Sequence, residues 1–89
     1  MGHSKDLDNQ KKHGVTFEEA QTVFFDERAL FMVDPVHADD EDRFLLMGLS
    51  VHLRMILVCH CYRQNDQVIR LISARKAARS EILQYWNRL

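Results

Sequence analysis

The spacing of apolar residues along the chain predicts helices at both ends and strands between them. Residues 5–13 are mostly polar and fit a short helix, which Gly14 would end in a left-handed conformation. A second short helix is predicted after Thr16, because Thr16 and Glu19 have the spacing of a capping box, in which each side chain accepts a hydrogen bond from the other residue's backbone amide. Its buried face is predicted from apolar residues at helical spacing: Phe17, Ala20, Val23 and Phe24.

Four extended segments follow, and the links between the last three are too short for parallel pairing. We predict strands at 29–33, 43–49, 54–63 and 68–73. The two later links hold four residues each, whereas a parallel crossover needs about a dozen or more. The last three strands should therefore form an antiparallel meander. The second and third strands are apolar at almost every position, which predicts a central pair covered on both faces.

Helical spacing returns over residues 74–87, with one predicted apolar stripe made of Ala78, Ile82, Tyr85, Trp86 and Leu89. The predicted fold is a single α+β domain over residues 1–89, with an antiparallel four-stranded sheet, two short N-terminal helices and one C-terminal helix. The longest apolar run, residues 44–49, is too short to cross a bilayer. No signal-like segment follows the start, so we expect a cytoplasmic protein without a membrane partner.

The formal net charge of −1 hides an asymmetry between the two halves of the chain. Residues 1–42 hold four lysines and arginines against eleven acids, and residues 43–89 hold eight against two. Seven of those eight cations are arginines, whose forked guanidinium groups match phosphate oxygens in pairs. The second half therefore favours a polyanionic ligand. The alternative is that the two halves neutralise each other across one compact domain.

The end of the fourth strand concentrates three of these cations: Arg75, Lys76 and Arg79. If the last helix begins at residue 74, Arg75 and Arg79 are one turn apart and point the same way. Two arginines so placed can grip neighbouring phosphates or stabilise the charge of a phosphorane. The alternative is a solvated helix face that pairs with the acids at 39–42.

Two segments contain metal-ligand residue types, and neither has the spacing of a metal site. Strand alternation places His60 opposite Cys59 and Cys61, and no second ligand pair has suitable spacing. The acidic segment 34–42 lacks the turn glycine of a calcium loop. We therefore expect no metal, no cofactor and buried cysteines that remain reduced.

His60 and Tyr62 are predicted to share one face of the third strand, opposite the cysteines. They could line a site as a proton acceptor and a phenolic donor. The alternative is a histidine that is satisfied within the core. The pattern of the strand leaves both interpretations open.

Five sequence blocks, spread from about Lys5 to about Tyr85, resemble one protein family when taken in their order and spacing. The two most specific are NQKKHGVTFEEA at 9–20 and IRLISARKA at 69–77. Shorter ones are DPVH at 34–37, DRFLLMG at 42–48 and HCYR at 60–63. On these blocks the chain resembles the BrnT family of toxins from type II toxin–antitoxin systems.

This resemblance implies an antiparallel sheet with flanking helices, similar to the RelE-type ribonuclease toxins. Members of the family are taken to be RNA-cleaving toxins that arrest translation, and we expect the cleavage to need no metal ion. The resemblance further implies a BrnA-type antitoxin with a ribbon-helix-helix domain. We expect a heterotetramer with an antitoxin dimer, so that DNA is bound only through the antitoxin.

Metal-free cleavage needs a base for the 2′-hydroxyl, cations for the phosphorane and an acid for the leaving 5′-oxygen. The predicted catalytic residues are Arg43, His60, Tyr62, Arg75 and Arg79. In this hypothesis the arginines stabilise charge, His60 transfers protons with help from Tyr62, and Glu81 is a reserve base. Backbone contacts to RNA are expected from Arg63, Arg70 and Lys76.

The start of the chain differs from the family pattern. Members usually open with an aromatic-acidic strand that ends in Trp-Asp, whereas this chain opens with Met-Gly-His-Ser at 1–4. We interpret residues 1–4 as a cloning remnant or an altered start. Without that strand, one edge of the sheet would be missing or exposed, which would put full activity in doubt.

Two other functions compete with a ribonuclease at this point. One is a non-enzymatic module whose basic C-terminal half docks nucleic acid or an acidic protein. The other, a DNA-binding repressor that acts alone, is disfavoured because the sequence shows no helix-turn-helix spacing.

Overall fold

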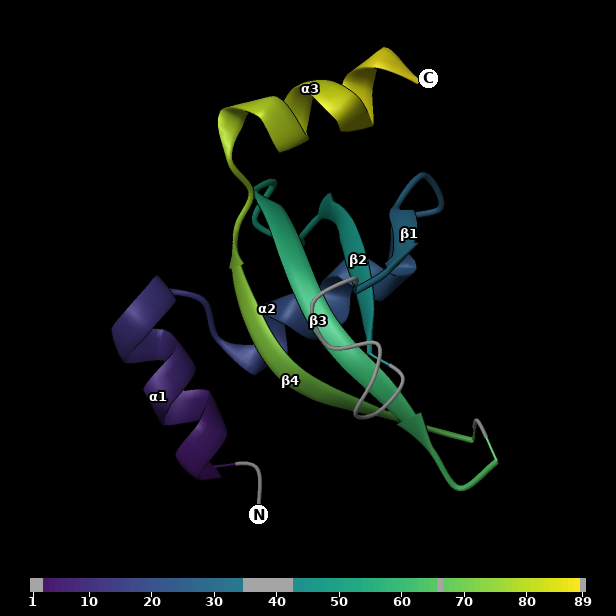
Figure 1. Cartoon of the computed structure of the whole chain (residues 1–89). Helices are drawn as coiled ribbons and strands as arrows, with labels where there is room; N and C mark the ends of the chain where they lie inside the picture. The colour runs from purple at the N-terminus through teal and green to yellow at the C-terminus, as the bar shows by residue number, and fades with distance from the viewer. Residues whose placement is uncertain (1–2, 35–42, 66, 89) are drawn as a thin grey trace.

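The computed structural model describes residues 3–34, 43–65 and 67–88, which form one antiparallel sheet with flanking helices (Figure 1). The helices are α1 (His3–His13), α2 (Phe17–Thr22), which continues as the 3₁₀ turn η1 (Val23–Phe25), and α3 (Arg79–Asn87). The strands are β1 (Leu30–Val33), β2 (Phe44–Leu49), β3 (Met55–Arg63) and β4 (Val68–Lys76). They lie in the order β1-β2-β3-β4 with every neighbouring pair antiparallel, so the predicted α+β meander is confirmed.

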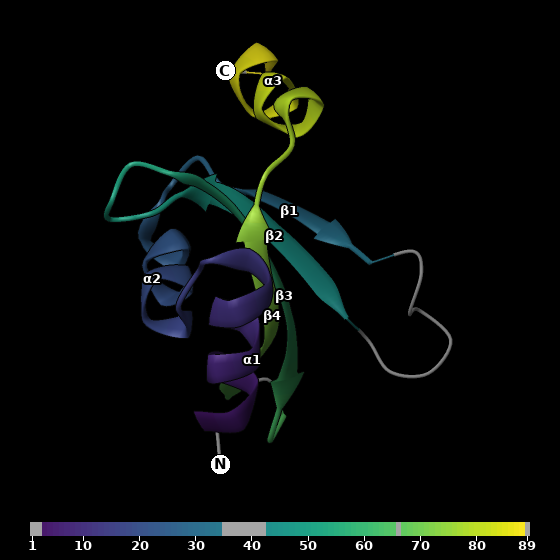
Figure 2. The same cartoon turned by 90° about the vertical axis from the view of Figure 1, so that its left-hand side faces the viewer.

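The helices cover the sheet unevenly (Figures 1 and 2). α2 lies on one face, α1 lies against β4, and α3 lies beyond one end of the sheet. Within the described residues, no helix is long and apolar enough to cross a membrane.

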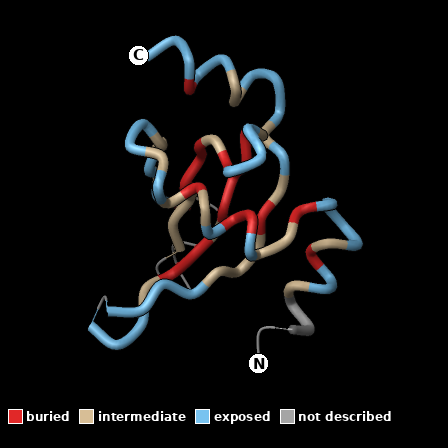
Figure 3. Tube along the Cα trace, turned by 180° about the vertical axis from the view of Figure 1, so that it is seen from behind, coloured by how far each residue is buried: buried red, intermediate tan, exposed pale blue. Residues whose placement is uncertain are grey.

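Two clusters of buried side chains pack on opposite faces of the central strands. On the α2 face, the core consists of Val15, Ala20, Val23, Leu46, Ile56, Val58 and Ala74. On the other face, which we call the α3 face, it consists of Met47, Met55, Leu57 and Tyr85. Figure 3 shows the buried residues gathered along the middle of the sheet, with exposed residues at the β3–β4 hairpin. The predicted coverage of β2 and β3 on both faces is confirmed for the central residues of the two strands.

One buried carboxamide fastens α1 to the edge of β4. The Asn9 Nδ2 group donates to the Ala74 carbonyl at 2.8 Å and to the Val15 carbonyl at 2.7 Å. The Asn9 Oδ1 atom accepts from the Ala74 amide at 2.9 Å, and Asn9 is 5% exposed. A side chain therefore supplies the hydrogen bonds that a further strand would otherwise give to Ala74.

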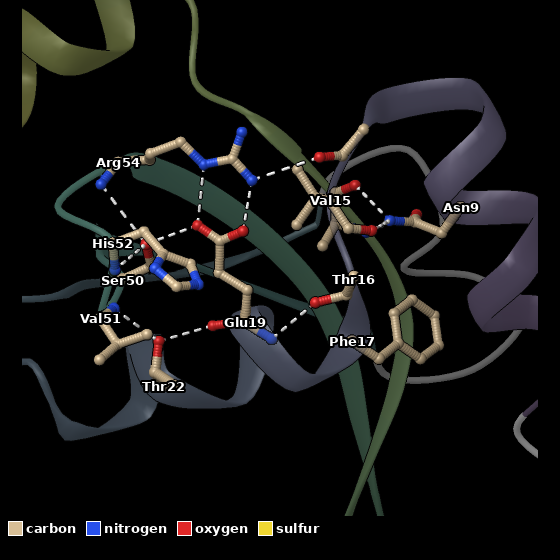
Figure 4. A network of polar contacts seen from close by, with 12 residues as sticks. Asn9, Val15, Thr16, Phe17, Glu19, Thr22, Ser50, Val51, His52 and Arg54 are labelled. Carbon is tan, nitrogen blue, oxygen red and sulfur yellow. Dashed lines mark hydrogen bonds and ion pairs between the residues drawn. The ribbon is translucent and has the colours of Figure 1, made fainter.

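The start of α2 confirms one half of the predicted capping box. The Thr16 hydroxyl accepts from the Glu19 amide at 3.0 Å (Figure 4). The Glu19 carboxylate turns instead toward the β2–β3 turn, where it accepts from the Ser50 hydroxyl at 2.7 Å and from the guanidinium group of Arg54. The hydrogen bond from Arg54 lowers the pKa of Glu19, so this buried carboxylate stays ionised and ties α2 to the sheet.

The predicted start of the C-terminal helix at residue 74 is wrong. Residues 74–76 continue β4 and pair with residues 56–58 of β3. The Ala77 amide then donates to the Met55 carbonyl at 2.9 Å, and α3 begins at Arg79. Alanine, arginine and lysine favour a helix locally. The ladder to β3 and the burial of Ala74 outweigh that preference.

Tyr85 anchors α3, whereas the rest of the predicted stripe contributes less. Tyr85 is 1% exposed, and its hydroxyl donates to the Asp26 carboxylate at 2.6 Å. A Cβ atom on Gly48 would lie 2.8 Å from the same carboxylate, so glycine is needed for this approach. Trp86 is 48% exposed, and Leu89 lies outside the described residues.

Substitution of Asn9 tests the attachment of α1. Asn9→Ala should lower the free energy of unfolding by about 2–4 kcal/mol, because the Ala74 amide and carbonyl would be left without their partners. Lys11→Ala is the matched control at an exposed position of the same helix and should change stability by less than about 0.5 kcal/mol. Urea unfolding followed by circular dichroism measures both, and equal stability of the two variants would contradict this role.

Candidate functional site

Alternation along β3 distributes the predicted site residues over both faces of the sheet. Because Val58 belongs to the α2 face and Leu57 to the α3 face, the residues that follow can be assigned in turn. His60 and Tyr62 lie on the α2 face, and Cys59 and Cys61 lie on the α3 face. The prediction that His60 stands opposite the two cysteines is confirmed.

An extra residue in β4 places two arginines on the same face. Arg75 pairs with Leu57 and Arg70 pairs with Cys61, and the register shifts between them so that Ile72 is left out of the pairing. Since Arg70 and Arg75 are five positions apart, a regular strand would point them to opposite faces. The β-bulge reverses this alternation and brings both arginines to the α3 face.

Two more arginines lie on the same face. One step beyond the pair of Phe44 with His60, Arg43 stands beside Cys61. The Phe44 ring lies with that of His60 on the α2 face, so alternation puts Arg43, the residue before it, on the α3 face. Arg63 ends β3 on that face by alternation and is exposed. We call the four residues Arg43, Arg63, Arg70 and Arg75 the arginine row.

Arg75 is held by a carboxylate from α3. Its Nη1 and Nη2 atoms donate to the two oxygens of Glu81 at 2.9 and 2.8 Å, a paired arrangement with two parallel hydrogen bonds. The Arg75 side chain is nevertheless 42% exposed. The hydrogen bond from Arg75 lowers the pKa of Glu81. Sequence reasoning missed this partnership because it placed both residues on one helix, where they are six positions apart.

The predicted pairing of Arg75 with Arg79 on one helix face is wrong. Arg75 lies in β4, and Arg79 is the first residue of α3, where it is exposed. Lys76 follows Arg75 in the strand and pairs with Ile56, so it lies on the α2 face. Three cations that are close in sequence therefore lie on the α3 face, on the α2 face and at the start of α3, respectively.

His60 lies in an aromatic cluster on the α2 face and is fully buried. Its ring is 5.0 Å from that of Phe24 and 5.4 Å from that of Tyr62, and the rings of Phe31 and Phe44 are about 6 Å away. Burial lowers the pKa of His60, so the ring is neutral near pH 7. Its Nε2 atom has no hydrogen-bond partner among the described residues. The structure does not bring His60 or Tyr62 to the arginine row.

The two cysteines are free thiols beneath the arginine row. The Cys59 thiol contacts the Asp34 carboxylate at 3.9 Å, and burial raises the pKa of Cys59, which makes it a weak nucleophile. In the part of the chain that the structure describes, no three His, Cys, Asp or Glu side chains gather as a metal site would require. Most of the acidic segment considered for a cation, 35–42, lies outside those residues.

The arginine row spans three adjacent strands and suits an extended anion. Neighbouring strands are about 4.8 Å apart, so Arg43, which directly precedes β2, and Arg70 on β4 are about 10 Å apart at the backbone. Guanidinium groups bind phosphate oxygens in pairs. A set of this width can contact successive phosphates of one nucleic-acid strand rather than a single small anion.

The chain was also compared with known proteins. Among curated proteins, no match was found. A family model described as the ribonuclease toxin BrnT of type II toxin–antitoxin systems matches residues 2–81, a segment that includes the whole sheet and the arginine row. The resemblance in the sequence blocks is thereby confirmed, and the chain belongs to the BrnT family of ribonuclease toxins.

Proposed function

We propose that this protein cleaves RNA without a metal ion and that the arginine row is its RNA-binding and catalytic surface. Its family supplies the ribonuclease class. The observation that supports this site is the β-bulge at Ile72, which sets Arg70 and Arg75 on the same face. A bulge interrupts the ladder of a strand, and bulges are over-represented next to active sites because they re-aim side chains.

In the proposed reaction the ribose 2′-oxygen attacks the adjacent phosphorus after its proton passes to a base. The bond to the 5′-oxygen breaks and that oxygen takes up a proton, which gives a 2′,3′-cyclic phosphate and a 5′-hydroxyl. Negative charge builds on the non-bridging phosphate oxygens along this path, and guanidinium donors stabilise it. We assign that role to Arg75, which is both partly exposed and held by Glu81. Arg43, Arg63 and Arg70 hold the flanking phosphates.

Four residues that the sequence suggested lie outside the arginine row. Two of them are excluded from the proposed site, and two keep only a general attraction for RNA. His60 and Tyr62 lie on the α2 face, across the sheet from Arg75. Arg79 lies at the start of α3, and Lys76 faces the other side of the sheet. We therefore expect His60 and Tyr62 to act in packing, and Arg79 and Lys76 to add general attraction for RNA.

We further propose that the toxin arrests translation in the cytoplasm and is neutralised by a BrnA-type antitoxin with a ribbon-helix-helix domain. The type II family implies an antitoxin partner. We expect an antitoxin dimer to hold two toxins in a heterotetramer and to supply the DNA contacts. An antitoxin that covers the arginine row would exclude RNA from the surface that cleaves it.

Substitutions in the arginine row test the site. Arg75→Ala should slow cleavage of a defined single-stranded RNA by about 10²–10³-fold, the loss expected for one charge contact in the transition state. Arg75→Lys should recover only part of the rate, because lysine lacks the paired donors. Lys12→Ala, an exposed cation on α1, is the control and should keep the wild-type rate. All reactions contain a chelator, and circular dichroism checks the fold of each variant.

Wild-type rates in a variant with both Arg70→Ala and Arg75→Ala would remove the arginine row from the mechanism. Salt-sensitive binding of RNA by the wild-type protein, with no loss of intact RNA, would favour the non-enzymatic module instead.

His60→Phe separates packing from proton transfer. Phenylalanine suits the surrounding aromatic cluster, so we expect a folded protein whose cleavage rate is within a few-fold of wild type. A folded His60→Phe protein that loses cleavage by about 100-fold or more would instead show the histidine to be a proton-transfer group.

Mixing with the cognate antitoxin tests neutralisation. Light scattering should show a complex of higher mass than either component, and RNA cleavage should stop once the antitoxin is saturating. Unchanged cleavage in the saturated complex would contradict neutralisation by coverage of the arginine row.

A further inference from the structure

Glu81 makes three short hydrogen bonds at the junction of β4 and α3. One oxygen accepts from Arg75 Nη1 at 2.9 Å and also from the Ala78 amide at 2.7 Å. The other oxygen accepts from Arg75 Nη2 at 2.8 Å. The same carboxylate therefore caps the first turn of α3 and fixes the end of a guanidinium group that belongs to the sheet.

The hydrogen bonds of Arg75 leave one edge of its guanidinium group available. A guanidinium has five N–H donors in a planar fork. Nη1 uses its two donors on Glu81 and on the Lys76 carbonyl at 3.2 Å, and Nη2 uses one on Glu81. Among the described residues no partner is found for the Nε–H and the second Nη2–H, which point along the same edge of the plane. Those two donors form a second fork of the kind that binds phosphate oxygens in pairs.

The hydrogen bonds and the ionised form of Glu81 favour a role as the structural partner of Arg75 over a role as a catalytic base. Both of its oxygens accept hydrogen bonds, and the pKa of Glu81 is lowered chiefly by the bond from Arg75. A carboxylate held in this way is a poor acceptor for the proton of a 2′-hydroxyl. The reserve-base role suggested by the sequence therefore has little support in the geometry.

We propose that Glu81 is a positioning residue, which holds the end of the Arg75 guanidinium group so that its free edge meets the scissile phosphate. This inference rests on the proposed function, because it specifies how Arg75 acts in RNA cleavage. An arginine side chain loses much rotational freedom when it is fixed. Glu81 imposes that order before RNA arrives, and small errors in the placement of a catalytic group cost large factors in rate.

Glu81→Gln is the variant that tests this role. Glutamine keeps an oxygen for the Ala78 amide, but its amino group cannot accept the second hydrogen bond from Arg75. The rate constant kcat should fall by about 10- to 100-fold. KM, and the affinity for a 2′-O-methyl RNA that cannot be cleaved, should stay the same or improve because a negative charge near the RNA is removed.

Tyr85→Phe is the matched control for a merely structural role. It removes the hydrogen bond from α3 to Asp26 and leaves Arg75 and Glu81 untouched. This variant should keep the wild-type kcat. An equal fall of kcat in Tyr85→Phe and Glu81→Gln would show that docking of α3 matters rather than the position of Arg75.

The double variant Arg75→Ala, Glu81→Gln distinguishes positioning from direct catalysis. If Glu81 acts through Arg75, the double variant cleaves as slowly as Arg75→Ala alone. A further loss in the double variant would make Glu81 a base and overturn the proposal. Faster cleavage by Glu81→Gln would also overturn it, because Glu81 would then compete with the phosphate.

A measurement without catalysis separates this inference from the proposed function. The Arg75 Nε–H signal in NMR spectra should show a restricted side chain in the wild type and a mobile one in Glu81→Gln. Addition of the 2′-O-methyl RNA should shift that signal. A mobile Arg75 in the wild type would refute positioning even if RNA is cleaved. A rigid Arg75 that shifts with RNA in a protein that does not cleave it would instead contradict the proposed function and leave only the ordering of Arg75 by Glu81.

Discussion

The pairing of β4 with β3 determines most of the features on which the proposed activity depends. Its register sets Ala74 at the outer edge, where Asn9 of α1 binds. The shift at Ile72 turns Arg70 to the face that Arg75 occupies. The final bond of the ladder, from Ala77 to Met55, ends the strand at the point where Glu81 can reach Arg75. One ladder therefore seats the N-terminal helix, assembles the arginine row and positions the C-terminal helix.

The same arrangement explains how the uneven charge of the chain is used. Glu19 comes from the acidic half and neutralises Arg54, an arginine directly before β3 that braces α2 against the sheet. Arg75 has its partner within the basic half, in Glu81. The two ion pairs thus do different work, since one holds a helix on the α2 face and the other orders a side chain on the opposite face.

The elements and their order could be predicted from the sequence because they follow from local rules. A polar stretch ended by Gly14 gave the first helix, the Thr16 cap and apolar spacing gave the second, and four-residue links required antiparallel neighbours. The start of α3 could not be found in this way, because the residues after Ser73 are good helix formers and only their ladder with β3 keeps them extended. The β-bulge could not be predicted either, because neither glycine nor proline is adjacent to Ile72 in the sequence.

The sequence predicted the kind of chemistry at the candidate site better than it predicted which residues form the site. The excess of arginine in the second half, and the family blocks, pointed to RNA. Strand register decides which arginines share a face, and local sequence rules do not reveal it. Arg70 therefore joins Arg75 in the proposed site, whereas Arg79 lies outside the sheet at the start of α3. His60 carried a plausible signal for proton transfer, but the aromatic residues that bury it come from distant parts of the chain.

The bond of Asn9 to Ala74 also bears on how the protein avoids self-association. The free side of an outer strand is a template for pairing with another chain, and soluble proteins commonly block it. Here the block is a single amide side chain on a short polar helix, inserted where the next strand would otherwise add. Loss of α1, by proteolysis or by local unfolding, would uncover the outward hydrogen-bonding groups of Ala74 on β4. The N-terminal helix thus protects this edge of the sheet against pairing with another strand, a task separate from anything that the toxin does to RNA.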